Sequence, residues 1–198
     1  MSKFSKYLPQ KRPMGFIAAS LISLVVCVFY PSDLASYHAH LGAERPAWVE
    51  PTETKLRFVN TIIQIGLPLL LRDKEGMVQL LYLGVATTVA TQGLKRVVND
   101  VHVGGTRIGE RPYAPDSRYN MPSGHTTMSS CAVYFVARRY GWRHLLYLVP
   151  ILLLTMGARI MLDAHTLSAV LAGALIGFIC AAWYTSPYRK QPTEETPK

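Results

Sequence analysis

The feature that most constrains this chain is a set of apolar segments with few or no charged residues. The first of them, Met14–Tyr30, contains no charged side chain. Five more follow at Phe58–Leu71, Gly76–Leu94, Gly124–Ala137, Leu145–Leu162 and Thr166–Tyr184. A helix needs about 20 mostly apolar residues to cross a bilayer. Only 17% of the 198 residues are charged, against roughly 25% in soluble domains. The sequence therefore predicts an all-α integral membrane bundle of six transmembrane helices.

The charges outside these segments predict how the bundle lies in the membrane. The chain carries 21 Lys and Arg against 12 Asp and Glu. A cytoplasmic N-terminus places most cations outside two polar loops on the cytoplasmic side, as the positive-inside rule requires. We therefore expect a cytoplasmic interfacial N-terminus over residues 1–13, a six-helix domain over residues 14–186 and a cytoplasmic tail over residues 187–198. Because the positive charge is divided between two membrane faces, the sequence argues against a nucleic-acid partner.

Two polar loops carry the residue types that suit chemistry on an anion. One loop, residues 95–125, joins the third and fourth segments, and the other, residues 159–168, joins the fifth and sixth. Two crossings separate the loops, so both lie on the outer side of the membrane. Convergent cations and histidines favour phosphate as the ligand and acid–base or nucleophilic chemistry as the reaction. The residues brought together in this way are Lys95, Arg111, His125, Arg159 and His165.

The start of the fourth segment, Pro122-Ser123-Gly124-His125, has the properties of an anion site. Proline is tolerated in a first helical turn, and Ser123 is a residue type that caps free backbone N–H groups. Gly124 allows the backbone to approach a ligand closely. Since a helix N-terminus presents unsatisfied N–H groups and partial positive charge, we expect a phosphate group there.

These residues resemble the motifs of the type 2 phosphatidic acid phosphatase superfamily, which are Lys-x6-Arg-Pro, Pro-Ser-Gly-His and Ser-Arg-x5-His-x3-Asp. The second motif is complete at residues 122–125, and Arg159 and His165 keep the five-residue spacing of the third. Lys95 and Arg111-Pro112 match the first motif with nine additional residues between them. Within the superfamily, the short chain and the loops at residues 107–113 and 162–166 are most similar to bacterial lipid A 1-phosphatases.

The resemblance implies a phosphatase without metal ion or cofactor that acts on a phosphorylated membrane lipid. The narrower similarity implies the 1-phosphate of lipid A as substrate, at the periplasmic face of a bacterial inner membrane. His165 is implied as the nucleophile that forms a phosphohistidine, and His125 as the acid that protonates the leaving oxygen. The groups implied to hold the phosphoryl oxygens belong to Lys95, Arg111, Ser123, Gly124 and Arg159.

The chain departs from the family pattern at the third motif. Ala158 replaces the serine, and Ala169 stands where the family has the aspartate that orients the nucleophilic histidine. We therefore expect another acceptor to hold His165. The candidates are the carboxylates of Asp163, Asp100 and Glu110, or a backbone carbonyl. The lengthened first motif also leaves Arg107 as an alternative to Lys95.

Three other functions fit the same residues. The first is a broad lipid phosphatase acting on undecaprenyl pyrophosphate or phosphatidylglycerophosphate. The second is a lipid phosphotransferase, in which another acceptor replaces water at the phosphohistidine. The third is a non-catalytic transporter or scaffold, which the lost aspartate favours and the two histidines with phosphatase spacing oppose.

Overall fold

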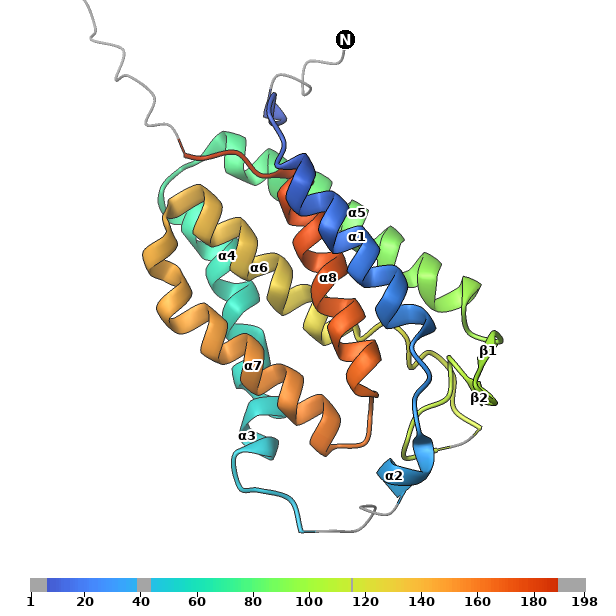
Figure 1. The fold of residues 1–198 in the computed structure, drawn as a ribbon. Helices are drawn as coiled ribbons and strands as arrows, with labels where there is room; N and C mark the ends of the chain where they lie inside the picture. Colours follow the sequence, from blue (N-terminus) through green and yellow to red (C-terminus); the bar gives the residue numbers. More distant parts are fainter. Residues whose placement is uncertain (1–6, 39–43, 115, 189–198) are drawn as a thin grey trace, which may run out of the picture.

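The computed structural model describes residues 7–38, 44–114 and 116–188, and these residues form a helical bundle (Figure 1). Predictions for residues 1–6 and 189–198 therefore lie outside the described residues. The elements follow in the order α1 (Met14–Phe29), α2 (Leu34–His38), α3 (Val49–Thr54), η2 (Leu56–Phe58), α4 (Val59–Leu70), α5 (Lys74–Val97), β1 (His102–Val103), β2 (Thr106–Arg107), α6 (Gly124–Tyr140), η3 (Trp142–His144), α7 (Leu145–Met161) and α8 (Leu167–Tyr184). Strands β1 and β2 pair antiparallel in a small hairpin.

Each of the six predicted apolar segments coincides with a helix. Among the described residues, three stretches are long and apolar enough to cross a membrane, namely Lys74–Val97, Trp142–Met161 and Leu167–Tyr184. Two shorter apolar stretches are Met14–Phe29 and Leu56–Leu70. Helix α6 is the most polar of the six because it is an internal helix that packs against α4, α5, α7 and α8. Its buried hydroxyls are hydrogen-bonded within the protein: Thr127 and Ser130 donate to carbonyl oxygens one turn earlier, and Ser129 accepts the Asn60 amide of α4.

Helices α6 and α8 pack closely because α8 presents small residues at four-residue intervals. A Cβ atom at Gly173 would lie 2.4 Å from the Ser123 carbonyl oxygen, and one at Gly177 would lie 2.1 Å from Ser130 Oγ. Ala169 and Ala181 continue the same stripe and are fully buried. Stripes of this kind let two backbones approach in membrane bundles. The contact brings the first turn of α6 beside the first turn of α8.

The two ends of the bundle differ. The start of α1 and the end of α8 lie together at one end, whereas α2, α3 and the β hairpin lie at the other (Figure 1). At the first end, Arg12 Nε donates to the Trp183 carbonyl oxygen at 3.1 Å, and its guanidinium stacks on the Trp183 ring. Helix α3 docks on α7 at the second end, where the Trp48 ring lies against Gly157.

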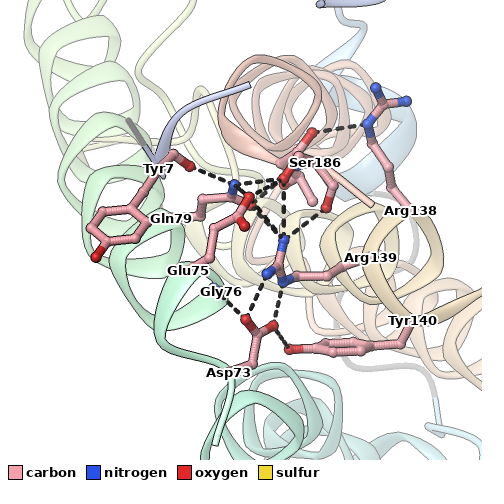
Figure 2. A network of polar contacts seen from close by, with 10 residues as sticks. Tyr7, Asp73, Glu75, Gly76, Gln79, Arg138, Arg139, Tyr140 and Ser186 are labelled. Atoms are coloured by element: carbon pink, nitrogen blue, oxygen red, sulfur yellow. Dashed lines mark hydrogen bonds and ion pairs between the residues drawn. The ribbon is translucent and has the colours of Figure 1, made fainter. Parts of the chain in front are cut away.

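A buried ion pair between Asp73 and Arg139 lies at the end that holds the start of α1. We call the group Asp73, Glu75, Gln79, Arg139 and Ser186 the Asp73–Arg139 cluster (Figure 2). Arg139 donates through Nε and one terminal nitrogen to Asp73, and through the other to the Ser186 carbonyl oxygen at 2.9 Å. Gln79 Nε2 donates to the Tyr7 carbonyl oxygen at 2.8 Å. The cluster thereby joins α5, α6, the segment after α8 and the segment before α1.

Asp73 has a second role at the start of α5. Its carboxylate accepts the Gly76 N–H at 2.9 Å, which caps the helix, and the Tyr140 hydroxyl at 2.8 Å. Burial disfavours the charged carboxylate, but the hydrogen bonds from Arg139, Gly76 and Tyr140 outweigh this effect and hold the pKa of Asp73 below its usual range. Ionised Asp73 is thus fully paired within the protein.

Candidate active site

The polar loops meet in a cavity at the end of the bundle opposite the Asp73–Arg139 cluster. The end of α5, the start of α6, the end of α7 and the turn before α8 converge there with the loop that carries Arg111. The cavity has a volume of about 380 Å³. Its lining consists of Thr87, Thr88, Thr91, Gln92, Lys95, Arg111, Gly124, His125, Thr127, Met128, Arg159 and His165. The structure therefore brings six of the seven predicted site residues to one cavity, and Ser123 is the exception.

His165 lies in the turn between α7 and α8 and is held by a backbone carbonyl. Its Nδ1 lies 2.7 Å from the Asn120 carbonyl oxygen, and the side chain is buried. A carbonyl oxygen only accepts, so Nδ1 carries the proton and Nε2 keeps its lone pair. Burial, together with the charges of Arg159, Lys95 and Arg111, lowers the pKa of His165 well below its usual value. The imidazole is therefore neutral and suited to act as a nucleophile.

Asn120 is itself fixed on several sides. Its N–H donates to the Gly109 carbonyl oxygen at 3.0 Å. Its side-chain amide donates to Thr166 Oγ1 at 3.2 Å and accepts the Thr166 N–H at 3.1 Å. Of the acceptors considered from the sequence, the backbone carbonyl therefore holds His165 Nδ1. Asp163, Asp100 and Glu110 do not fill this role.

Ala169 is directed into an apolar cluster instead of the cavity. It is fully buried and packs with Val28, Val98, Ile108 and Met121. Its carbonyl oxygen accepts the Ser123 N–H at 2.9 Å, which ties α8 to the start of α6. The residue at this position thus serves the helix contact, and the Asn120 carbonyl supplies the hydrogen bond to His165.

Two arginines that line the cavity each carry a buried donor without a protein acceptor in the described part of the chain. Among the described residues, Nε of Arg111 and Nε of Arg159 are buried and lack a hydrogen-bond partner. The hydroxyl of Thr91, a residue that is only 5% exposed, is also buried without a hydrogen-bond partner among these residues. Buried donors without acceptors are costly. Three such groups around one cavity indicate that a ligand rich in acceptor oxygens completes the site, and a phosphate group has this chemistry.

Lys95 lines the cavity and also holds the loop that precedes α6. Its ammonium donates to the carbonyl oxygens of Tyr119 at 2.8 Å and Pro122 at 2.7 Å. Arg107, the alternative suggested by the lengthened motif, lies in β2 and lines a different cavity. Arg107 donates to the Ser117 carbonyl oxygen at 2.6 Å. The structure therefore places Lys95, and not Arg107, beside the two histidines.

Ser123 differs from the sequence-based expectation. Its hydroxyl makes no capping hydrogen bond to α6 and instead accepts the Thr126 hydroxyl at 3.0 Å. The residue is fully buried, because the start of α6 packs closely against α8 at Gly173. Gly124 and His125 do line the cavity. Since α6 begins at Gly124, the N–H groups of its first turn lack helical acceptors and add to the anion-binding character.

Glu53 and Arg57 are site neighbours that sequence reasoning missed. Glu53 in α3 accepts a hydrogen bond from Arg159 at 2.7 Å and forms an ion pair with Arg57 in η2. The spacing of Glu53 and Arg57, four residues apart, is a signal for a local helical pair. Nothing in the sequence signals that α3 folds back onto α7. Asn120 was missed for a similar reason, since its contribution is a main-chain oxygen.

Comparisons with known proteins agree with these observations. The family model described as PAP2 superfamily matches residues 16–192. The Lipid A 1-phosphatase of Helicobacter pylori strain J99 is 40% identical over 185 residues, which cover 93% of this chain and 94% of the relative. The protein of the same description from strain 26695 is 38% identical over the same shares of both chains. The Lipid A 4'-phosphatase of strain J99 is 34% identical over 134 residues, 67% of this chain and 65% of the relative.

A solved structure shares the fold. It is the crystal structure of the first transmembrane PAP2 type phosphatidylglycerolphosphate phosphatase from Bacillus subtilis, with a TM-score of 0.55. The match covers 85% of this chain and 92% of that chain at 19% identity. At this identity the likeness concerns the arrangement of helices.

Proposed function

This chain belongs to the PAP2 superfamily, and from that premise we propose that it removes the 1-phosphate of lipid A through a phosphohistidine intermediate. The observation that carries the chemistry is the cavity at which His125 and His165 meet Lys95, Arg111 and Arg159. The similarity to Lipid A 1-phosphatase over 93% of the chain supports the substrate.

In the proposed first step, the His165 Nε2 lone pair attacks phosphorus and forms a P–N bond. The P–O bond to the lipid breaks, and His125 donates its proton to the departing oxygen. In the second step, neutral His125 accepts a proton from water as the water oxygen attacks phosphorus. The P–N bond then breaks, its electron pair returns to Nε2, and inorganic phosphate leaves.

The cations are proposed to act on the charge of the phosphoryl group. In phosphoryl transfer this charge spreads over the equatorial oxygens. Arg111 and Arg159 supply fixed guanidinium donors, and Lys95 supplies a point charge. The Asn120 carbonyl keeps Nε2 unprotonated and stabilises the positive imidazole that forms on attack, the role that a carboxylate performs in a catalytic triad.

For the membrane arrangement, we propose six spans, cytoplasmic termini and a periplasmic active site in a bacterial inner membrane. The start of α1, the start of α5, the end of α6 and the end of α8 share one end of the bundle (Figure 1), and the sequence at the start of α5 and the end of α6 carries Arg72, Lys74, Arg138 and Arg139. The positive-inside rule supports a cytoplasmic location for this end. A fluorescent protein fused after residue 198 is expected to fluoresce, and an alkaline phosphatase fused there is expected to be inactive.

The test of the function is phosphate release by the purified, detergent-solubilised chain in EDTA. Lipid A, undecaprenyl pyrophosphate and phosphatidylglycerophosphate are supplied separately, and His165→Ala is the control. We expect release from lipid A alone, with the 4'-phosphate retained, and no release by the variant. Mass spectrometry of the product distinguishes loss of the 1-phosphate from loss of the 4'-phosphate.

The other outcomes each change a defined part of the proposal. Release from all three lipids keeps the chemistry and assigns a broad lipid phosphatase. Transfer of phosphate to an added lipid acceptor assigns a phosphotransferase. No release from any lipid by the folded wild-type chain contradicts enzymatic function and favours a transporter or scaffold.

A further inference from the structure

Helix α3 delivers a carboxylate to a site that is otherwise built from cations. Glu53 Oε1 accepts the Arg159 guanidinium at 2.7 Å and also pairs with Arg57. The Arg159 side chain is 10% exposed and that of Glu53 is 21% exposed. A carboxylate beside an anion-binding arginine repels the ligand, so its presence calls for a function that outweighs this repulsion.

The position of α3 does not depend on the ion pair. The Trp48 ring lies close to Gly157 on α7, where an added Cβ would be 3.0 Å from the ring. Val49 on α3 is only 1% exposed, and α3 makes extensive contact with α7. Packing therefore holds α3 against α7 at Gly157, which is two residues before Arg159 in the sequence. The contact between Glu53 and Arg159 is an additional interaction on an element that is already docked.

Arg159 lines the cavity together with both histidines. Glu53 and, through it, Arg57 are connected to the cavity by the contact between Glu53 and the Arg159 guanidinium. The orientation of Arg159 therefore matters both for the nucleophile and for the leaving oxygen.

We propose that Glu53 is a positioning residue that fixes the Arg159 guanidinium across the phosphoryl site. The carboxylate engages one terminal nitrogen of Arg159, and the buried Nε without a protein acceptor remains for a phosphoryl oxygen. The guanidinium group is planar and rigid, so a hydrogen bond that fixes one of its nitrogens also fixes the direction of the N–H groups on the others. The proposal rests on the proposed phosphatase function and adds a residue outside the family motifs.

The test is binding of orthovanadate, a mimic of the phosphoryl transition state, measured by calorimetry on the full-length chain in detergent. Glu53→Gln keeps the size of the side chain and removes its charge. Glu53→Asp keeps the charge and withdraws the carboxylate by one methylene. Glu50→Gln, an exposed acidic residue on the same helix, is the matched control. Thermal unfolding and the kcat and KM for lipid A are measured on the same preparations.

Positioning predicts that Glu53→Gln and Glu53→Asp each weaken vanadate binding and lower kcat by about 10-fold, since a small misplacement of a catalytic group has effects of this order or larger. Both variants are expected to unfold at the temperature of Glu50→Gln and to change KM less than kcat. If charge alone matters, Glu53→Gln binds vanadate more tightly and Glu53→Asp behaves as wild type. Either result overturns the proposal.

The remaining outcomes separate this inference from the proposed function. Wild-type vanadate binding without lipid phosphatase activity overturns the substrate assignment and leaves the Glu53 comparison measurable. Absence of vanadate binding by the folded wild type overturns the inference, because Arg159 then has no phosphoryl ligand. A lower unfolding temperature of Glu53→Gln with wild-type kcat and vanadate affinity assigns a purely structural tie and also overturns it.

Discussion

Two groups of buried polar residues lie at opposite ends of the same bundle, and they differ in how completely their hydrogen bonds are made. In the Asp73–Arg139 cluster, all three guanidinium nitrogens of Arg139 have acceptors from Asp73, Gln79 or Ser186 (Figure 2). In the candidate active site, Nε of Arg111, Nε of Arg159 and the Thr91 hydroxyl have no acceptor among the described residues. The first group is complete within the protein, whereas the second leaves three buried polar groups without an acceptor in the described part of the chain.

The number of guanidinium donors with protein acceptors distinguishes structural from functional arginines in this bundle. A buried charge is tolerated when it is paired and hydrogen-bonded. Arg139 meets this condition because its guanidinium joins α6 to the start of α5 and to the segment after α8, so its interactions stabilise the fold. Arg159 makes one ion pair and keeps a buried donor unused. In the proposed function, this unused donor binds a phosphoryl oxygen, and it accelerates the reaction if it binds the transition state more strongly than the substrate.

The largest expected effect is at the nucleophile. His165→Ala should lower kcat/KM for lipid A by more than about 1000-fold, because no other group near phosphorus replaces the imidazole. The unfolding temperature should stay within a few degrees of wild type. Phosphate release and thermal unfolding measured on one preparation check both statements. Activity retained within tenfold would show that His165 is not the nucleophile.

The reverse pattern is expected for Arg139. Arg139→Met leaves the Asp73 carboxylate buried without its partner, and loss of one member of a buried pair costs about 3 kcal/mol. We expect this loss in the free energy of unfolding, followed by denaturant titration in detergent, while kcat per folded molecule is unchanged. A lower kcat at unchanged stability would couple the two ends of the bundle and remove the distinction between them.

Arg159→Lys provides the matched comparison with Arg139. Lysine keeps the charge but loses the planar fork, and removal of one oriented donor from a catalytic site costs about 100-fold in kcat. Stability is expected to change little, because α3 stays on α7 through Trp48. Steady-state kinetics and thermal unfolding of both variants complete the comparison. Arg159 joins the structural class if its substitution destabilises the fold and spares kcat.

Much of this arrangement could be predicted from sequence, because it depends on local patterns. Apolar segments located six of the helices, although the second and fourth segments were identified only because the stronger segments around them must connect. The motif Pro-Ser-Gly-His, together with the spacing from Arg159 to His165, selected four residues that line the cavity, namely Gly124, His125, Arg159 and His165, and the first motif added Lys95 and Arg111. Short spacing within a motif constrains geometry directly, which explains why these residues were found.

The parts that sequence did not predict depend on main-chain atoms or on distant contacts. The acceptor for His165 is the carbonyl oxygen of Asn120, and any residue type has such an oxygen. Glu53 reaches Arg159 only because Trp48 docks α3 against Gly157. Ser123 was expected in the cavity, but the close approach of α8 at Gly173 covers it. Arg139 resembled an ordinary cytoplasmic charge, because its partner Asp73 is remote in sequence.

The pH dependence of activity gives a smaller effect that tests the same site. Burial and the charges of Arg159, Lys95 and Arg111 lower the pKa of His165, so the neutral nucleophile persists below the ordinary histidine value of about 6.5. We expect no loss of kcat/KM from protonation of His165 as pH falls through 6.5, and an acidic decline only at lower pH. In Arg111→Gln the acidic decline should move to higher pH, since one charge that disfavours the imidazolium is gone. A decline centred at the ordinary value in both proteins would contradict the structure.

The smallest expected effect concerns the unpartnered hydroxyl of Thr91. One turn earlier on α5, the Thr87 hydroxyl donates to the Leu83 carbonyl oxygen of its own helix at 2.5 Å. Thr91 makes no such bond, although both residues line the cavity. Thr91→Val should lower kcat/KM by about 5-fold if its hydroxyl binds the substrate, which corresponds to one hydrogen bond of about 1 kcal/mol. Thr87→Val should leave kcat/KM unchanged, because that hydroxyl is already satisfied. Equal kinetics for the two variants would show that the Thr91 hydroxyl does not contact the substrate. The unpartnered donors assigned to the substrate would then be those of the two arginines.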